Sequence, residues 1–245
     1  GWNILCISMM RWVSQSRYSG QRSSSSRGES GCQTAIRTAL AAFEANPEAG
    51  LVYGDVGSID AAGRMFNRMR FRQYELEDLM SFHIISQPGV FMRREVLEVV
   101  GLLDTAYHYL LDHQLWLRMA AQAPMVYVPQ VLAYARFHPA AKNKAQAARF
   151  GEEIQAIRYW MQTYPPLARR AEEQESSIEA GAKWVEGYYL VEAGQPLKAL
   201  KAYARCFRKS PLRALTAWKR ILLAAALLVG GNRLRRALDG LRKGL

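Results

Sequence analysis

The apolar positions of the chain change period along its length, and the first clear period is helical. In residues 34–45, apolar side chains stand at Ile36, Leu40 and Phe43, which share one face of a helix. Asn46-Pro47 predicts the end of that helix, because proline cannot continue it. We therefore expect a helix over 34–45 with these three residues facing the core.

A strand-rich stretch follows. Apolar runs at residues 51–56 and 64–71, separated by the turn sequence Asp-Ala-Ala-Gly at 60–63, predict a β-hairpin. Residues 125–137 predict further strand structure, interrupted at Pro129.

Residues 87–119 predict a short strand, a helix that ends at Gly101, a loop, and a second helix that begins near Asp112. Gly101 suits a left-handed C-cap, and the positive end of the helix dipole favours a carboxylate such as Asp112 in a first turn. The pattern thus places an acid at the start of a helix, beside a strand and a Tyr-rich loop.

The rest of the chain predicts helices only. Tyr164-Pro165-Pro166 breaks the helical pattern, and we place a boundary there between a domain at residues 34–163 and a helical region at 164–245. Residues 184–210 resemble one tetratricopeptide-like helical hairpin that turns at Gly194-Gln195-Pro196. A single hairpin cannot bury its own face, so we expect it to pack on neighbouring helices.

Residues 1–33 do not share these patterns. Residues 15–31 are rich in Ser, Arg and Gly and offer little to bury. The apolar start of the chain lacks the preceding basic residues and the following small-residue cleavage site of a signal peptide. We expect 1–33 to be disordered, or an out-of-frame segment outside the fold.

Composition is that of a globular chain, with half of the 245 residues hydrophobic and 22% charged. The net charge of +12 is concentrated in residues 196–245, where thirteen Lys and Arg face one acid, Asp239. A localised positive charge indicates an anionic partner. Nucleic acid is not expected as that partner, because no aromatic-basic recognition motif accompanies the charge.

Cysteine spacing and hydropathy bear on the compartment. Cys6, Cys32 and Cys206 are far apart and have no His at ligand spacing, which supports neither a disulfide framework nor a zinc site. No run reaches the roughly 18 apolar residues that a membrane span requires. We expect a cytoplasmic protein, with the inner face of the membrane as one location within that compartment.

Two interpretations of the apolar run at residues 221–229 remain open. Its nine residues are too few to span a bilayer, yet an apolar helix with basic flanks suits an interfacial anchor, with membrane contact through 213–245. The alternative is a buried C-terminal helix with a solvated basic tail.

A series of short motifs in a fixed order carries a resemblance to a known family. The motifs are Tyr53-Gly54-Asp55, Ile59-Asp60 with Gly63, Gln87-Pro88-Gly89-Val90-Phe91, Arg93-Arg94, Gly101-Leu102-Leu103-Asp104, Leu111-Asp112, Leu115-Trp116-Leu117-Arg118 and Arg136-Phe137-His138. Together they resemble the acceptor-side half of a family 2 glycosyltransferase of GT-A fold, over roughly residues 34–160. The resemblance implies an α/β class: a partial GT-A, Rossmann-like domain followed by an all-helical C-terminal region.

The resemblance also implies a reaction. A family 2-like, inverting enzyme of polysaccharide biosynthesis would transfer a sugar from a nucleotide-sugar donor to a glycan or lipid-linked acceptor, with Mg²⁺ or Mn²⁺. The acceptor hydroxyl loses its proton as it attacks the anomeric carbon, so a carboxylate must lie within hydrogen-bond reach. By resemblance, Asp112 is this catalytic base and His138 is a metal ligand.

The resemblance assigns substrate binding to five further residues: Gln87, Pro88, Trp116, Arg118 and Arg136. The residues themselves leave plainer roles open. Asp112 alone reads as a first-turn acid, His138 as a surface histidine in a basic loop, and Trp116 as a core residue packed on Ala120.

The chain departs from the family at its front. GT-A enzymes begin with a β-α-β nucleotide-binding half that carries an acidic metal-binding cluster, whereas the first aspartate of this chain is Asp55. We therefore expect a truncated or frame-disrupted form. The alternative is a non-catalytic helical and basic module that docks on an anionic membrane or another macromolecule.

Overall fold

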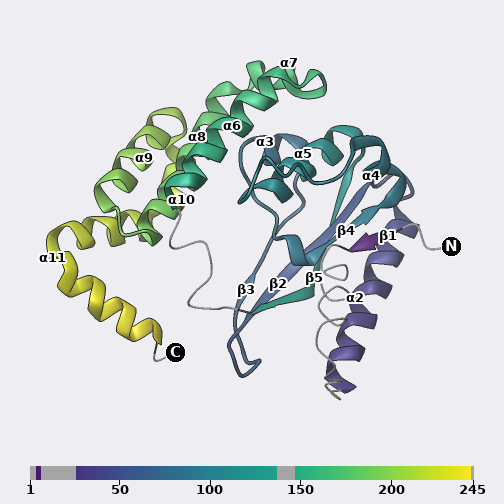
Figure 1. The fold of residues 1–245 in the computed structure, drawn as a ribbon, viewed down its shortest axis with the longest axis horizontal. Helices are drawn as coiled ribbons and strands as arrows, with labels where there is room; N and C mark the ends of the chain where they lie inside the picture. Colours follow the sequence, from purple (N-terminus) through teal and green to yellow (C-terminus); the bar gives the residue numbers. More distant parts are fainter. Residues whose placement is uncertain (1–3, 7–25, 137–146, 244–245) are drawn as a thin grey trace. The chain divides into compact units, whose positions relative to one another are not determined.

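The computed structural model describes residues 4–6, 26–136 and 147–243, which fall into two compact units (Figure 1). The first unit comprises Gly1–Leu79 and His83–Pro139, and the second comprises Met80–Phe82 and Ala140–Leu245. A mixed sheet with helices in the first unit and helices alone in the second confirm the α/β class. The break predicted at Tyr164 separates two helices that both belong to the second unit.

The first unit is built around one five-stranded sheet. Its strands are β1 (Ile4–Cys6), β2 (Leu51–Ile59), β3 (Met65–Met69), β4 (Val90–Arg93) and β5 (Met125–Arg136). The central strand, β2, pairs in parallel with β5 along its whole length. Antiparallel β4 and β3 pair with the first and last parts of β2, respectively, and β1 adds to β4.

Two features of the sheet follow the sequence closely. The hairpin predicted over 51–71 is present as β2 and β3, with Gly63 at φ 81° in the turn. Strand β5 continues past Pro129 because the register shifts there: Val128 pairs with Gly54 and Val131 with Asp55. A bulge of this kind accommodates a residue that has no N–H for the ladder.

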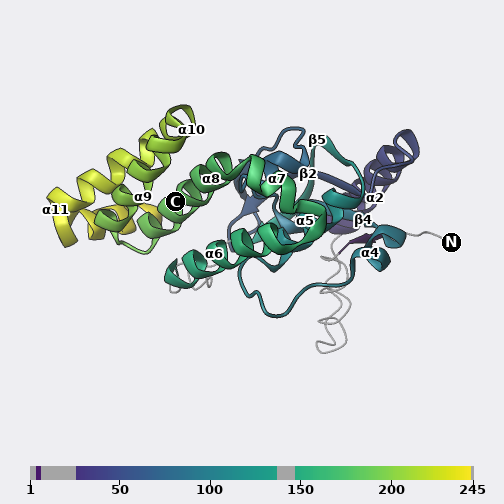
Figure 2. The same ribbon diagram turned by 90° about the horizontal axis from the view of Figure 1, so that it is seen from above.

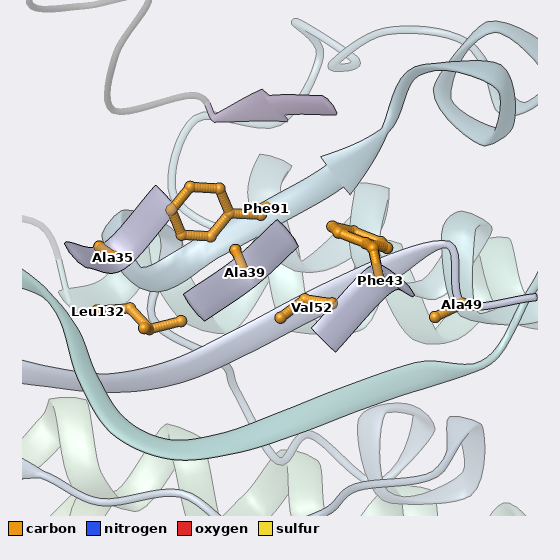
Figure 3. Packing of buried hydrophobic residues seen from close by; sticks show 7 residues of the cluster. All are labelled: Ala35, Ala39, Phe43, Ala49, Val52, Phe91 and Leu132. Carbon is orange, nitrogen blue, oxygen red and sulfur yellow. The ribbon is translucent and has the colours of Figure 1, made fainter. Parts of the chain in front are cut away.

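Five short helical elements accompany the sheet: α2 (Ser26–Ala45), α3 (Leu76–Met80), η1 (Gln87–Gly89), α4 (Arg94–Val100) and α5 (Leu111–Gln122). Helix α2 packs on the sheet through Ala35, Ala39 and Phe43, which meet Val52, Phe91 and Leu132 together with Ala49 (Figure 3). Of the three residues predicted to face the core, Phe43 is buried, Ile36 packs on this cluster while half-buried, and Leu40 is half-buried. Small alanine side chains let the helix backbone approach the strands closely.

Part of the segment predicted to lie outside the fold has regular backbone structure. Residues 4–6 form β1, paired with β4, and α2 begins at Ser26 rather than Thr34. The rest of residues 1–33 lies outside the described residues.

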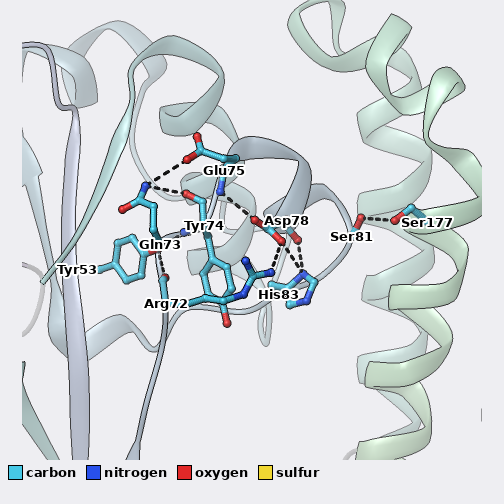
Figure 4. Close-up of polar contacts among 9 residues, drawn as sticks. All are labelled: Tyr53, Arg72, Gln73, Tyr74, Glu75, Asp78, Ser81, His83 and Ser177. Carbon is cyan, nitrogen blue, oxygen red and sulfur yellow. Dashed lines mark hydrogen bonds and ion pairs between the residues drawn. The ribbon is translucent and has the colours of Figure 1, made fainter. Parts of the chain in front are cut away.

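The described part of the second unit consists of helices and the short segments that connect them, as predicted. Its helices are α6 (Ala147–Thr163), α7 (Pro165–Glu173), α8 (Glu175–Glu192), α9 (Pro196–Lys209), α10 (Pro211–Thr216) and α11 (Trp218–Lys243). Proline stands at the start of α7, α9 and α10, where a missing N–H costs no helical hydrogen bond. The hydroxyls of Ser81 and Ser177 lie 2.9 Å apart within this unit (Figure 4).

Helices α8 and α9 form the predicted hairpin (Figure 2). Gly194 turns the chain between them at φ 68°. Gly187 lies so close to Tyr203 that a Cβ there would stand 2.8 Å from the ring. The hairpin also packs on its neighbour, because Leu190, Ala199 and Tyr203 share one cluster with Ala217 and Ala224. Among the described residues, no helix combines the length and the apolar character needed to cross a membrane.

Candidate active site

The predicted catalytic acid lies in the first turn of α5. Helix α4 ends at Gly101, whose φ of 83° suits glycine and whose N–H donates to Leu97 O at 2.8 Å. The loop that follows leads to Leu111, the first residue of α5. Asp112 is partly exposed there, and its Oδ1 accepts the His113 N–H at 2.7 Å. The helix N-terminus favours the ionised carboxylate at this position.

Arg118, one and a half turns further along α5, joins the two helices. Its guanidinium donates to Val100 O, to Leu102 O at 2.6 Å and to Gln114 Oε1 at 3.1 Å. The planar fork of arginine suits such a bridge between carbonyls. These bonds give Arg118 a positioning role, in which it fixes the loop between Gly101 and Asp112, and its expected substrate contact stays a prediction.

The inner face of α5 packs in the interior of the first unit. Trp116 and His113 are fully buried, so the expected substrate contact of Trp116 is replaced by packing in the core. Burial lowers the pKa of His113 to about 4, which leaves this imidazole neutral near pH 7. The start of α5 is thus held by a neutral, apolar layer.

Gln87 and Pro88 lie in η1 and are partly exposed. The next residue, Gly89, seats this turn against β2, because a Cβ at Gly89 would stand only 2.9 Å from Gly54 O. The turn that carries Gln87 and Pro88, to which the resemblance assigns substrate binding, therefore packs beside Asp55 on the central strand.

Asp55 is the centre of a buried polar network that the sequence did not reveal. Its carboxylate is 1% exposed and accepts hydrogen bonds from Arg68 Nε (2.7 Å), the Phe71 N–H (3.0 Å) and Tyr127 Oη (2.7 Å). Burial acts to raise the pKa of Asp55, but the donors from Phe71, Tyr127 and Arg68 outweigh it and hold the pKa below its usual value. The carboxylate of Asp55 consequently has a structural role in the fold.

Tyr127 is one of the hydrogen-bond donors to Asp55 in this network. Its burial, with its hydrogen bond to Asp55 and the negative charge there, raises the pKa of Tyr127 to about 12. The phenol therefore stays protonated and donates to the carboxylate at any physiological pH. The spacing of these residues along the chain gives no sign of the network, since Asp55 and Tyr127 stand 72 positions apart.

A second polar cluster fixes the segment after β3 (Figure 4). Tyr53 Oη donates to Arg72 O at 2.6 Å and accepts the Tyr74 N–H at 2.7 Å. Gln73 binds the backbone of β5 on both sides, through Met125 O and the Tyr127 N–H. These bonds tie the segment to β2 and β5.

Asp78 anchors the far end of the same cluster (Figure 4). Its carboxylate accepts the Glu75 N–H at 3.1 Å and pairs with Arg72 at 2.7 Å. The carbonyl of Asp78 lies 3.0 Å from Nδ1 of His83. Each of these contacts closes a backbone turn, so the cluster holds the chain that leads to Gln87.

Of the two downstream residues of the predicted site, Arg136 and His138, the structure describes only Arg136. Arg136 donates through Nη1 to Asp60 O (2.8 Å) and Ala61 O (2.7 Å), which ties the end of β5 to the β2–β3 turn. That bonding gives Arg136 a role in the hairpin, and its expected contact with substrate stays a prediction. His138 lies outside the described residues.

The expected Mg²⁺ or Mn²⁺ stays a prediction, because its expected ligand, His138, lies outside the described residues. Across residues 4–6, 26–136 and 147–243, no group of three or more His, Cys, Asp or Glu is arranged to hold a metal ion. Both oxygens of Asp55 are already hydrogen-bonded. No chemical step is therefore derived through a metal.

Comparison with models of protein families finds no match to the chain. Comparison with curated proteins likewise finds no match. The ordered motifs and the geometry around α5 are the features of the chain that bear on its function.

Proposed function

We propose that the chain is a family 2-like, inverting glycosyltransferase domain of GT-A fold, in its acceptor-side part, and that Asp112 is its catalytic base. The donor is a nucleotide-sugar, and the acceptor is a hydroxyl of a glycan or lipid-linked sugar. The observation that carries the proposal is the position of Asp112: a partly exposed acid in the first turn of a helix whose remaining inner face is buried.

The main requirement for a catalytic base in this reaction is a position close to the acceptor hydroxyl. The acceptor oxygen attacks the anomeric carbon, the bond from that carbon to the diphosphate oxygen breaks, and the nucleoside diphosphate leaves on the opposite face. Asp112 takes the acceptor proton as the new bond forms. The positive end of the α5 dipole keeps the carboxylate ionised and ready to accept that proton.

The surroundings of Asp112 supply rigidity. Arg118 fixes the preceding loop through hydrogen bonds to Val100 O and Leu102 O. The buried side chains of His113 and Trp116 fix the orientation of α5 about its axis. A base held on a packed helix is placed more accurately than one on a free loop. Of the acids Asp55 and Asp112, only Asp112 combines a family motif with a partly exposed side chain.

The test is turnover by the full chain and two variants. Release of nucleoside diphosphate from UDP-, GDP- and dTDP-sugars is measured with Mn²⁺ and a membrane glycolipid extract as acceptor source. Asp112→Asn keeps the shape of the side chain but removes its basicity, so turnover should fall by about 10²–10⁴-fold. Glu98→Gln, an exposed acid on α4, removes the same charge and should keep wild-type turnover.

Folding is followed by circular dichroism and thermal unfolding of each variant. Equal losses of turnover in Asp112→Asn and Glu98→Gln would show a general charge effect and contradict the assignment of the base. An absence of diphosphate release from every donor by the folded wild-type chain would overturn the proposed function itself.

A further inference from the structure

An exposed apolar face runs along α10 and α11. Leu215, Trp218, Leu222 and Val229 are 54–93% exposed, which is unusual for side chains of this size. Trp218, Leu222 and Val229 of α11 are separated by four and seven positions, the spacing of one helix face, and Leu215 lies on α10. Ala225 and Ala226 lie within the same arc and are also exposed.

The opposite face of α11 is occupied by the second unit's own core. Ala224 is fully buried and packs, together with Ile221 and Leu223, in the cluster formed by α8 and α9. The apolar run at 221–229 is therefore divided: one face packs on the helical hairpin, and the other remains exposed. Neither a wholly buried helix nor a uniformly apolar anchor describes it.

Cations accompany the exposed face. Lys219 lies on α11 with its Nζ 5.4 Å from the Trp218 ring centre. On α9, Lys198, Lys201, Arg205 and Arg208 are exposed on the side of the helix opposite the residues that pack in the cluster with Ala224, and they add to the positive charge of the region. Beyond Val229, the sequence of α11 continues with further basic residues and a single acid.

We propose that α10 and α11 lie in the surface of an anionic lipid bilayer, with Trp218, Leu222 and Val229 inserted at the boundary between headgroups and acyl chains. A helix of 26 residues with an apolar face and basic companions has the features of an interfacial helix. Each cation near the surface gains from the negative lipid potential. Membrane binding by this surface is a function separate from sugar transfer, and it does not depend on that activity.

Charge favours lipid over a second copy of the chain as the occupant of this face. Residues 196–245 carry thirteen Lys and Arg and one Asp, so two such regions brought together would repel each other. An anionic bilayer offers an apolar interior for Trp218 and Leu222 and negative headgroups for Lys219. It satisfies both the apolar and the basic side chains of this region.

Vesicle co-sedimentation of the full chain tests the proposal. Vesicles of phosphatidylcholine alone are compared with vesicles that contain about one-third phosphatidylserine. We expect binding to the anionic vesicles to be at least about tenfold tighter and to weaken when salt is raised. The triple variant Trp218→Ser/Leu222→Ser/Val229→Ser should bind anionic vesicles at least about tenfold more weakly.

Val99→Ser is the matched control, because Val99 is 70% exposed but lies on α4 of the first unit. It should bind vesicles as the wild type does. All substituted side chains are exposed, and circular dichroism verifies that the variants fold. Equal binding by the triple variant and the wild type, or equal binding to both vesicle types, would overturn the proposal. So would concentration-dependent dimerisation that the triple variant abolishes, combined with no vesicle binding.

Discussion

Asp55 and Asp112 are acids of the same unit in opposite situations. Asp55 lies on the central strand, is 1% exposed and accepts three strong hydrogen bonds, including one from Arg68. Asp112 lies in the first turn of α5, is partly exposed, and accepts a hydrogen bond from the N–H of His113 at the positive end of the helix dipole. Asp55 is therefore buried and hydrogen-bonded within the fold, whereas Asp112 is partly exposed to solvent.

The difference shows how one domain can use carboxylates for stability and for chemistry. An acid that is saturated with donors contributes to the native state but cannot accept another proton easily, because its pKa is lowered and its lone pairs are engaged. A partly exposed acid in the first turn of a helix can be reached by an acceptor hydroxyl from solvent. Substitutions of the two residues should therefore have separable effects, on folding for Asp55 and on turnover for Asp112.

The largest stability effect is expected at Asp55. Asp55→Ala leaves the Arg68 guanidinium, the Tyr127 hydroxyl and the Phe71 N–H without their acceptor, and should lower the free energy of unfolding by about 3–5 kcal/mol. Urea unfolding followed by circular dichroism measures it. Asp60→Ala is the control, since Asp60 pairs with the highly exposed Arg64 and should matter far less. Similar losses in both variants would contradict the distinction between buried and exposed pairs.

A smaller effect should appear as a pH dependence of stability from His113. This residue binds its proton near pH 4 when folded and near pH 6.5 when unfolded, so between these values the unfolded state holds more protons. Stability should then fall by about 2 kcal/mol from pH 7 to pH 5. The lowered pKa of Asp55 acts in a separate window, below its unfolded value of 3.8.

Urea unfolding at the two pH values checks this slope in the wild type and two variants. His113→Asn should abolish most of it, whereas His108→Asn, at an exposed position, should keep it. A slope that survives in His113→Asn would show that another group is responsible.

The smallest of the three effects is expected at Arg118. Arg118→Ala removes the bonds to Val100 O and Leu102 O, which lie near the surface, and should cost about 1–2 kcal/mol in the free energy of unfolding. Turnover should fall because the loop before Asp112 loosens, whereas donor affinity should stay unchanged. Arg118→Lys should restore only part of the turnover, since an ammonium cannot span both carbonyls. Full recovery in the lysine variant would argue against a bridging role.

Local patterns along the chain predicted much of the fold. The hairpin of β2 and β3, the end of α4 at Gly101, the start of α5 and the helical hairpin of α8 and α9 all depend on neighbours close in sequence. Glycine and proline mark those turns by their backbone preferences alone. Such elements are predictable because the interactions that define them are local.

Contacts between distant segments were not predictable in this way. Large apolar residues suggested that Ile36, Leu40 and Phe43 form the inner face of α2, but the close approach to the sheet buries Ala35 and Ala39 and leaves Ile36 and Leu40 half-buried. The network around Asp55 joins β2 to Tyr127 on β5, and Arg118 reaches back to α4. Both depend on strand register and helix packing, which a local period does not encode.

Nucleotide-sugar binding by the full chain tests the central claim most directly. Calorimetric titration with UDP-, GDP- and dTDP-sugars in the presence of Mn²⁺ is carried out on the wild type and on Asp112→Asn. Sugar transfer by this chain requires saturable binding of one donor without the usual β-α-β half, and the affinity should be the same in both proteins, because the base serves the acceptor and not the donor. The absence of saturable binding for every donor by the folded chain would contradict the assignment of sugar transfer.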